Sequence, residues 1–289
     1  MLAYWRSNQQ PPINHPMKAQ FPVFTRPRTV TRFYKLRPWE KPPPTRPRAI
    51  FIDVGVEKPR TGGVDRNAVR GISLTEYFAF VRRFWNDTVL FIIPDNHNVE
   101  EHFKRLEASL PYVTRLRGVM RSALPIVVCH YCDADGVFNK TLEWGGVIED
   151  AWGGSVAVGI PGAIITSARG KFKCADDVGK CIKYTSSLIM RLVDYGFSGR
   201  IHILGIRKRV FTFLHSSGLA RHVLSADTDA VDLAPSEDAR RGLRGCRGCF
   251  QVNSDPRLMD EWYLEWFKPY EPMLSVGDWL HRLSGLLAN

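Results

Sequence analysis

The sequence predicts an α/β protein folded as a (β/α)8 TIM-type barrel. Six short apolar runs lack the polar alternation of a half-exposed strand, and such runs suit parallel strands covered on both faces. They occupy residues 49–54, 89–94, 125–130, 155–160, 201–206 and 222–226. Helix-like segments fall between them, and this alternation is typical of a parallel sheet. The roughly 240 residues from position 49 onward are enough for eight such units.

One or two further strands are expected in residues 20–34 or 112–120. An open doubly wound sheet is the alternative architecture. No Gly-x-Gly-x-x-Gly follows the first strand, and its absence disfavours the dinucleotide-binding form of that fold.

Helix signals punctuate the chain at regular intervals. Ser73 and Glu76 form a capping-box pattern that opens a helix reaching about residue 85. Asn98 opens a second helix, which is expected to reach about residue 110. The remaining helices are expected at residues 175–195, closed by Gly196, at 208–216, followed by Gly218, and at 257–268 and 276–287.

The N-terminal segment differs in composition from the rest. Residues 1–50 contain ten Lys or Arg and one acid, Glu40, so they carry +9 of the net charge of +11. Ten of the 19 prolines also lie there. We therefore expect an extended basic arm over residues 1–48 and a barrel with C-terminal helices over residues 49–289. Such an arm suits contact with phosphate backbones and bases. The alternative is a strap packed on the barrel surface.

The longest apolar runs span about six to eight residues, against the roughly 20 that a membrane helix needs. Pro and Arg interrupt the N-terminus, which therefore lacks the apolar core of a signal peptide. The sequence thus predicts a soluble cytoplasmic protein without a membrane partner.

Three strand candidates end at a carboxylate: Asp53, Asp95 and Asp227. The carboxyl ends of parallel strands meet at one edge of the sheet, where α/β proteins place their chemistry. A single such Asp could simply cap the following turn. Three in one chain favour an active site.

The motifs around these carboxylates resemble the tRNA-guanine transglycosylase superfamily over about residues 49–230. The closest resemblance is to the DNA-modifying branch, the deoxypurine-in-DNA protein A family. The resemblance rests on Asp53-Val54-Gly55, Leu74-Thr75-Glu76-Tyr77, Pro94-Asp95-Asn96, Val158-Gly159-Ile160-Pro161-Gly162, Ile201-His202-Ile203-Leu204-Gly205-Ile206 and Ser225-Ala226-Asp227. Val54 replaces the family's Ser, and the zinc motif of the tRNA branch is incomplete.

The resemblance implies exchange of guanine in DNA, or less favoured in tRNA, for a preQ0-like 7-deazaguanine. Asp227 would be the nucleophile at the sugar C1′, since a carboxylate stabilises an oxocarbenium-like transition state, and Asp229 is the reserve candidate. Asp53 would act as acid and base, and Asp95 would bind the guanine edge. The base pocket would be completed by Gly159, Gly162 and Gly205. His130, at a strand end, could sit over the base or be a hydrogen-bonded structural residue.

Two clusters fall near the C-terminal end of the chain. Four arginines, Arg240, Arg241, Arg244 and Arg247, could hold the flanking backbone of a polynucleotide, or form an ordinary solvated loop. Cys246 and Cys249, with His281, are a candidate structural zinc site that lacks an evident fourth ligand. A disulfide or two free thiols are the alternatives, and the chemistry itself is expected to need no cofactor.

The other four cysteines lie earlier in the chain. Cys129 and Cys132 could be metal ligands, although their position at a strand end favours pocket lining. Cys174 and Cys181 are expected on one helix as buried apolar residues.

Two other functions compete with base exchange. Glycine-rich strand ends at residues 153–162 could hold the phosphate of a small substrate in a different barrel enzyme. A non-catalytic barrel that binds nucleic acid is the third hypothesis. The sequence leaves open which deazaguanine and which nucleotide context are used, and an oligomer is compatible with it.

Overall fold

A parallel sheet curled into a ring forms the centre of this α/β fold. The computed structural model describes residues 3–7, 33–36, 49–53, 73–86, 88–96, 98–120, 122–162, 164–167, 170–174, 176–228 and 285–286. The ring order is β1-β10-β9-β6-β5-β4-β3-β2, and every neighbouring pair is parallel. Its strands are β1 (Ala3–Ser7), β2 (Phe33–Leu36), β3 (Ala49–Ile52), β4 (Thr88–Ile92), β5 (Ala123–Val128), β6 (Ala157–Pro161), β9 (Ile201–Leu204) and β10 (Val223–Thr228).

The six strands predicted from apolar runs are all confirmed, from β3 to β10. Helices connect β3 to β4, β4 to β5, β5 to β6, β6 to β9 and β9 to β10. The segments after β1, β2 and β10 lie outside the described residues, so the complete set of eight helices stays a prediction.

Part of the expected N-terminal arm belongs to the barrel. β1 pairs with β10 and β2 pairs with β3, so these two strands close the ring. The boundary expected between residues 48 and 49 is therefore wrong for residues 3–7 and 33–36. Aromatic residues such as Trp5 and Phe33 favour strands, but the surrounding prolines and arginines dominate the composition of the segment. The overall composition of residues 1–48 therefore predicted an extended arm and hid the two short strands within it.

Five helices cover the sheet: α1 (Leu74–Arg82), α2 (Val99–Arg117), α3 (Asp135–Trp152), α4 (Val178–Asp194) and α5 (Lys208–Ser216). The capping box of α1 is confirmed. Ser73 Oγ accepts a hydrogen bond from the Glu76 amide, and the Glu76 carboxylate accepts one from the Ser73 amide. Gly196 and Gly218 follow α4 and α5 at φ of 83° and 76°, as a helix-ending glycine requires.

Two helical stretches depart from the sequence expectations. α2 continues through Pro111 to Arg117, so residues 112–120 do not hold a further strand, whereas β2 begins at the end of the other expected range, 20–34. The helix α3 was not predicted from the sequence, because its glycines and aromatic residues weaken the helix pattern. None of the helices in the described ranges is long and apolar enough to cross a membrane.

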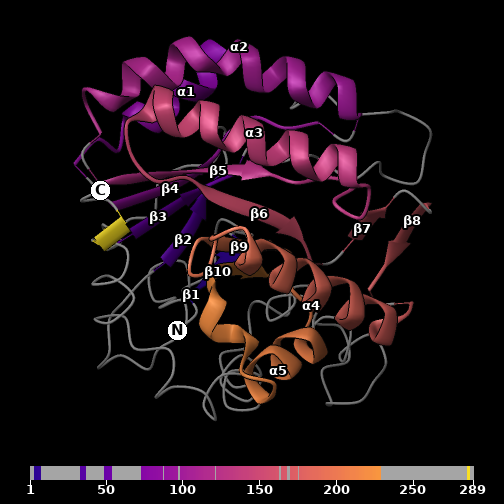
Figure 1. The fold of residues 1–289 in the computed structure, drawn as a ribbon. Coiled ribbons are helices and arrows are strands. Elements are labelled where there is room, and N and C mark those ends of the chain that lie inside the picture. The colour runs from indigo at the N-terminus through magenta and orange to yellow at the C-terminus, as the bar shows by residue number, and fades with distance from the viewer. Residues whose placement is uncertain are drawn as a thin grey trace, which may run out of the picture.

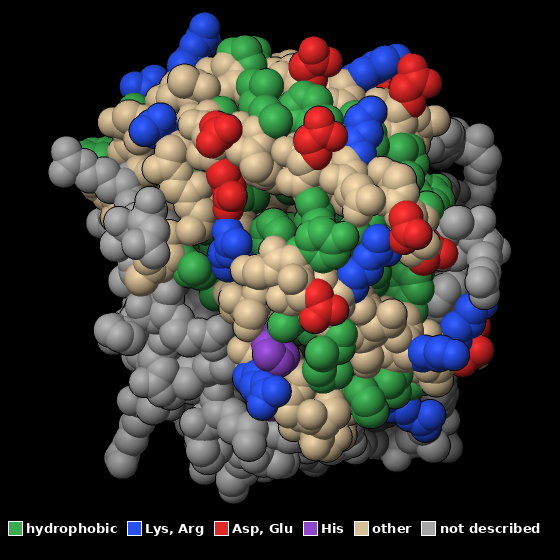
Figure 2. All heavy atoms as spheres, viewed as in Figure 1, with side chains coloured by type: hydrophobic (Ala, Val, Ile, Leu, Met, Phe, Trp, Pro, Cys, Tyr) green, Lys and Arg blue, Asp and Glu red, His purple; other side chains and the backbone are tan. Residues whose placement is uncertain are grey.

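The helices form an outer layer in two groups (Figure 1). α1, α2 and α3 lie together over β4 and β5, and α4 and α5 lie beside β6, β9 and β10. Each group buries its own apolar cluster against the sheet. The face seen in Figure 2 intersperses acidic and basic side chains and gathers no patch of one sign.

A small antiparallel hairpin, β7 (Ile164–Ser167) and β8 (Gly170–Lys173), separates β6 from α4. Cys174 follows it and forms a disulfide with Cys181 of α4. Their expected burial is confirmed, but the expected placement on one helix is wrong, because Cys174 precedes α4 and faces back toward it. The disulfide therefore ties the hairpin to the first turn of α4.

Candidate functional site

The three aspartates predicted as an active site all lie at the carboxyl edge of the barrel. Asp53 directly follows β3, Asp95 lies shortly after β4, and Asp227 is the last residue but one of β10. β3 and β4 are neighbours in the ring, whereas β10 is separated from β3 by β1 and β2. The sheet therefore places Asp53 and Asp95 together, and Asp227 farther around the same edge.

Asp95 forms a buried pair with His130, which follows β5. His130 Nε2 lies 2.7 Å from Asp95 Oδ2, and both residues are 5% exposed. Arg105 donates to the Asp95 carbonyl at 3.3 Å. Of the residues expected in the base pocket, His130 is thus brought into direct contact with a predicted carboxylate.

Tyr77 feels the charges of both Asp53 and Asp95. Its hydroxyl is fully buried and donates to the Ile92 carbonyl at the end of β4. Burial raises the pKa of Tyr77 well above its ordinary value, and the charges of Asp53 and Asp95 raise it further. Tyr77 therefore stays protonated and remains a donor to the Ile92 carbonyl.

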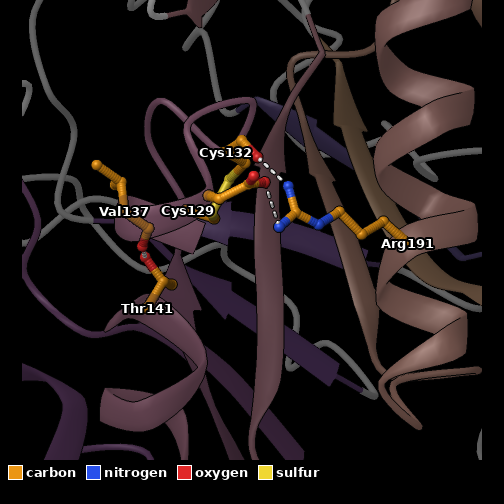
Figure 3. Close-up of a disulfide and its surroundings, with 6 residues drawn as sticks. Cys129, Cys132, Val137, Thr141 and Arg191 are labelled. Carbon is orange, nitrogen blue, oxygen red and sulfur yellow. Dashed lines mark hydrogen bonds and ion pairs between the residues drawn. A yellow bond between two sulfur atoms is a disulfide. The ribbon is translucent and has the colours of Figure 1, made fainter. Parts of the chain in front are cut away.

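A disulfide joins the residues on either side of the segment that contains His130. Figure 3 shows this disulfide and its surroundings. Cys129 and Cys132 are bonded to each other, and Tyr131 between them has a positive φ of 55°. Arg191 of α4 donates to the Cys132 carbonyl at 3.2 Å and pairs with Asp135 at 2.8 Å. The bonded cysteines supply no thiolate, so the metal-ligand alternative is not supported, and the loop instead fixes His130 against Asp95.

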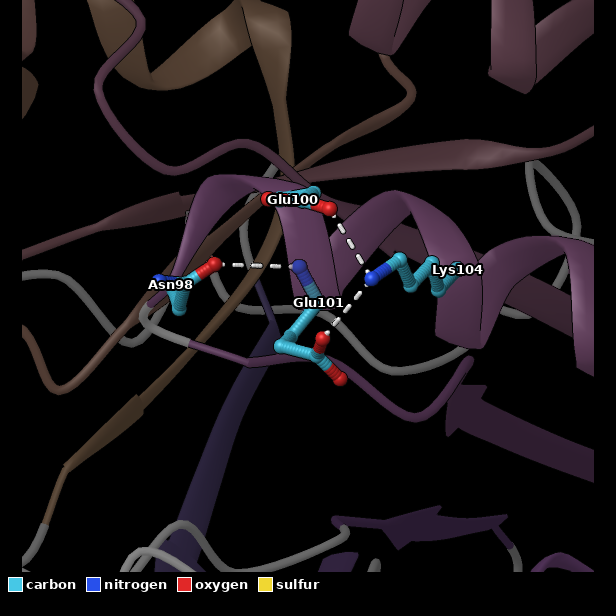
Figure 4. Close-up of polar contacts among 4 residues, drawn as sticks. All are labelled: Asn98, Glu100, Glu101 and Lys104. Carbon is cyan, nitrogen blue, oxygen red and sulfur yellow. Dashed lines mark hydrogen bonds and ion pairs between the residues drawn. The ribbon is translucent and has the colours of Figure 1, made fainter.

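The beginning of α2 fixes the other side of the Asp95 loop. Asn96 Oδ1 accepts from the Asn98 amide at 2.9 Å, and Asn98 Oδ1 accepts from the Glu101 amide at 3.1 Å (Figure 4). Such a cap stabilises a helix by about 1 kcal/mol. Lys104 pairs with Glu100 at 2.9 Å and with Glu101 at 3.2 Å on the exposed surface, where ion pairs contribute little. The side-chain caps, rather than the ion pairs, hold the loop.

His102 of α2 packs edge-on against His130, with ring centroids 5.6 Å apart. Burial, and to a smaller extent the neighbouring His130, lower the pKa of His102 to about 4 against opposing contributions from Asp95 and the Val128 backbone. His102 is therefore neutral at neutral pH and adds no positive charge beside the Asp95 pair.

Acidification should destabilise the fold through His102. Its pKa is about 4 in the folded chain against an ordinary 6.5, so below pH 6.5 the unfolded chain binds a proton that the folded chain does not. Stability present above pH 6.5 should fall as the pH drops toward 4, by about 3 kcal/mol in all. We expect His102→Gln to flatten this dependence in urea unfolding between pH 7 and 4.5.

Burial also lowers the pKa of His215 to about 4. The His102→Gln variant should therefore keep the part of the pH dependence of stability that His215 contributes. His222→Gln, in the short 3-10 turn η2 (Leu219–His222), is the matched control and should leave most of it in place. An unchanged dependence in His102→Gln would contradict the assignment.

Asp227 is held from the neighbouring strand β9. The Gly205 amide donates to Asp227 Oδ1 at 2.8 Å, and His202 Nε2 lies 3.4 Å from the same oxygen. Gly205 has a φ of 71°, a left-handed conformation that suits glycine and turns the amide toward the carboxylate. Gly205, expected to line the base pocket, thus contacts the predicted nucleophile directly.

The two glycines expected to approach the base are packed within the barrel instead. The Gly162 amide donates to the Leu204 carbonyl at 2.7 Å, so this hydrogen bond is used within the barrel and not for a base. The Gly159 carbonyl accepts from the Cys129 amide at 2.8 Å. Close strand packing explains both glycines, because a Cβ on Gly159 would meet Ile126 at 3.1 Å.

Gly162→Ala should destabilise the protein by roughly 1–3 kcal/mol, the usual range for overpacking. The added Cβ would lie 2.5 Å from Ile203 Cγ2 and 3.1 Å from the Leu204 carbonyl oxygen, and neither atom is the tip of a flexible chain. Thermal unfolding measures this loss. Gly146→Ala in α3, where a Cβ meets nothing within 4 Å, is the control and should be neutral or stabilising. Equal unfolding temperatures for the two variants would contradict the packing argument.

The remaining predicted residues lie outside the described ranges: Arg240, Arg241, Arg244, Arg247, Cys246, Cys249 and His281. Asp229, the reserve nucleophile, also lies outside them. Within the described part of the chain, no group of three His, Cys, Asp or Glu is arranged to hold a metal ion.

Sequence reasoning missed Tyr77, His102, His202 and Ser225 as members of the site. His202 Nδ1 lies 2.8 Å from Ser225 Oγ, and both residues are fully buried. Two signals were present: a His inside the apolar strand 201–206, and a Ser two residues before Asp227, which in a strand places both on one face.

No protein-family model, curated protein or solved structure matches this chain. Fold and site together define its class: a parallel α/β barrel with two buried carboxylate–histidine pairs at the carboxyl edge. One pair is Asp95 with His130, and the other is Asp227 with His202.

Proposed function

We propose that this chain is a guanine transglycosylase, built on a complete (β/α)8 barrel, that exchanges guanine in a polynucleotide for a 7-deazaguanine. The observation that carries the proposal is the placement of Asp227. It is 4% exposed, it accepts the Gly205 amide, and it shares the carboxyl edge with Asp53 and Asp95. A fixed, buried carboxylate suits nucleophilic attack at a sugar C1′.

The proposed reaction has two displacements at C1′. Asp227 attacks C1′ as the glycosidic bond breaks, and the departing guanine takes a proton from Asp53. The incoming deazaguanine then loses a proton to Asp53 and attacks C1′, which releases the Asp227 carboxylate. Asp53 is only half-buried, so it can exchange protons with solvent between the steps. No cofactor takes part in either displacement.

Asp95 is proposed to recognise the guanine edge. Carboxylate oxygens accept hydrogen bonds, and the guanine edge offers N1–H and an exocyclic amine as donors. His130 on Oδ2 orients the carboxylate, and the bracketing disulfide keeps His130 in place. Recognition and nucleophilic attack are thus assigned to opposite carboxylate–histidine pairs.

Contact with the polynucleotide is proposed for basic residues of the first 50 positions and for the arginines at 240, 241, 244 and 247. The helical face in Figure 2 mixes charges of both signs, so it offers no alternative phosphate track. Cys246, Cys249 and His281 are the residues proposed to hold a structural zinc ion.

Release of labelled guanine from DNA and from tRNA, measured side by side with a 7-deazaguanine base present, tests the proposal. We expect release from DNA to exceed release from tRNA. Binding without release from either polymer would favour the non-catalytic barrel. A small phosphorylated substrate is less favoured, because the Gly162 amide, which a phosphate would use, already donates to Leu204.

A further inference from the structure

A buried polar chain connects Ser225, His202 and Asp227. His202 Nδ1 lies 2.8 Å from Ser225 Oγ, and its Nε2 lies 3.4 Å from Asp227 Oδ1. Exposed fractions are 0%, 0% and 4% for Ser225, His202 and Asp227. His202 is fully buried and has a polar group beside each ring nitrogen. Because burying a polar side chain costs free energy, packing alone does not explain its presence here.

The imidazole lies in the barrel interior. Its ring centroid is 4.6 Å from that of Phe51, which belongs to β3. β3 and β9 are not neighbours in the ring, so this contact crosses the lumen. Phe51 therefore packs against the ring of His202 and restricts its movement away from Asp227.

The chemistry of the two partners determines where the imidazole carries hydrogen. A carboxylate only accepts hydrogen bonds, whereas a hydroxyl both donates and accepts. An Nε2–H facing Asp227 is thus favourable, and Nδ1 can accept from the Ser225 hydroxyl. A doubly protonated imidazole would also carry Nε2–H. Asp227 thereby favours the form of His202 that carries Nε2–H, and Ser225 is compatible with that form because its hydroxyl can donate to Nδ1.

We propose that His202, held at Nδ1 by Ser225, is a positioning residue for Asp227. The Gly205 amide donates to Oδ1 and His202 Nε2 lies 3.4 Å from the same oxygen, so the two groups together would hold Oδ1 and leave Oδ2 for the sugar. The 3.4 Å separation would shorten in the complex with substrate, as such contacts often do. This inference rests on the proposed function, in which Asp227 is the nucleophile.

Two substitutions separate positioning from packing. In His202→Gln the amide nitrogen reaches about as far as Nε2 and can still donate to Asp227. In His202→Asn the shorter side chain reaches about as far as Nδ1 and can serve only Ser225. We expect His202→Asn to slow formation of the covalent polynucleotide adduct by about 10²-fold, the scale of a misplaced reacting group, and His202→Gln to stay within about tenfold of wild type.

The control uses a second Ser–His pair of the same chain. Ser198 Oγ lies 2.9 Å from His222 Nδ1, outside the site, so His222→Asn should leave the adduct rate unchanged. Rates are expressed per folded molecule, and polynucleotide affinity should be equal in all variants. Equal rates for the Gln and Asn variants, or a faster Asn variant, would overturn the proposal.

The wild-type protein provides a measurement that does not depend on activity. Ring-nitrogen NMR of His202 should show hydrogen on Nε2, and Asp227→Asn should shift the Nε2 signal. A wild-type protein that forms no adduct refutes the transglycosylase proposal, and the NMR result then judges the His202–Asp227 contact separately. Hydrogen on Nδ1 alone would overturn the positioning role.

Discussion

Replacing Asp227 by Asn should abolish base exchange and the covalent polynucleotide adduct while polynucleotide binding remains. An amide is a very poor nucleophile, and loss of a catalytic nucleophile lowers the rate on the order of 10⁴-fold or more. The side chain keeps its shape, and its amide oxygen can still accept the Gly205 amide, so the barrel should fold normally. Gel mobility of the adduct, guanine release and polynucleotide affinity measure the three quantities on one preparation.

Asp53→Asn should behave differently. Attack by Asp227 remains available, so the adduct should form slowly, but the incoming base would lack an acceptor for its proton and exchange should not be completed. Asp229→Asn is the matched control near the end of β10. If Asp229→Asn lost exchange and Asp227→Asn kept it, the nucleophile would have been assigned to the wrong carboxylate.

The sequence predicts the central strands well because each is a continuous apolar run ending at a recognisable turn. Phe51, Ile52 and Pro125–Val128 are buried, and a run of this kind without polar alternation indicates a parallel sheet. β1 and β2 carry no such run, and only their pairing with β10 and β3 makes them strands. Tertiary pairing, which no local pattern encodes, determined those two elements.

The carboxylates of the site and His130 were predictable as site residues, but the pairing of each carboxylate with a histidine was not. Asp53, Asp95 and Asp227 end apolar runs, which is a local signal. The contact of His202 with Ser225 depends on the register of β9 against β10, and that register shifts between Val223 and Ser225. The pair of Asp95 and His130 likewise joins loops 35 residues apart. Side-chain pairs of this kind follow from strand alignment, which composition does not specify.

Deleting residues 1–40 should prevent folding of the barrel. The deletion removes β1 and β2, which close the ring between β10 and β3, and it leaves two unpaired strand edges. A loss of this size is comparable to the whole stability of a domain, roughly 5–15 kcal/mol. We expect no cooperative thermal transition in circular dichroism. A truncated protein that unfolds at the wild-type temperature would contradict the closed ring and restore the arm.

The charge of the same segment can be tested without disturbing either strand. Arg26, Arg28 and Arg32 lie between β1 and β2 in the sequence, and changing all three to Gln removes three of the N-terminal positive charges. If these residues hold phosphates, the slope of log affinity against log salt should fall by about three for duplex DNA, because each contact releases about one counterion. The unfolding temperature should stay near that of wild type, since both strands remain. An unchanged slope would show that these three arginines do not contact the polynucleotide, and a lowered slope at constant stability would separate their binding role from the structural role of β1 and β2.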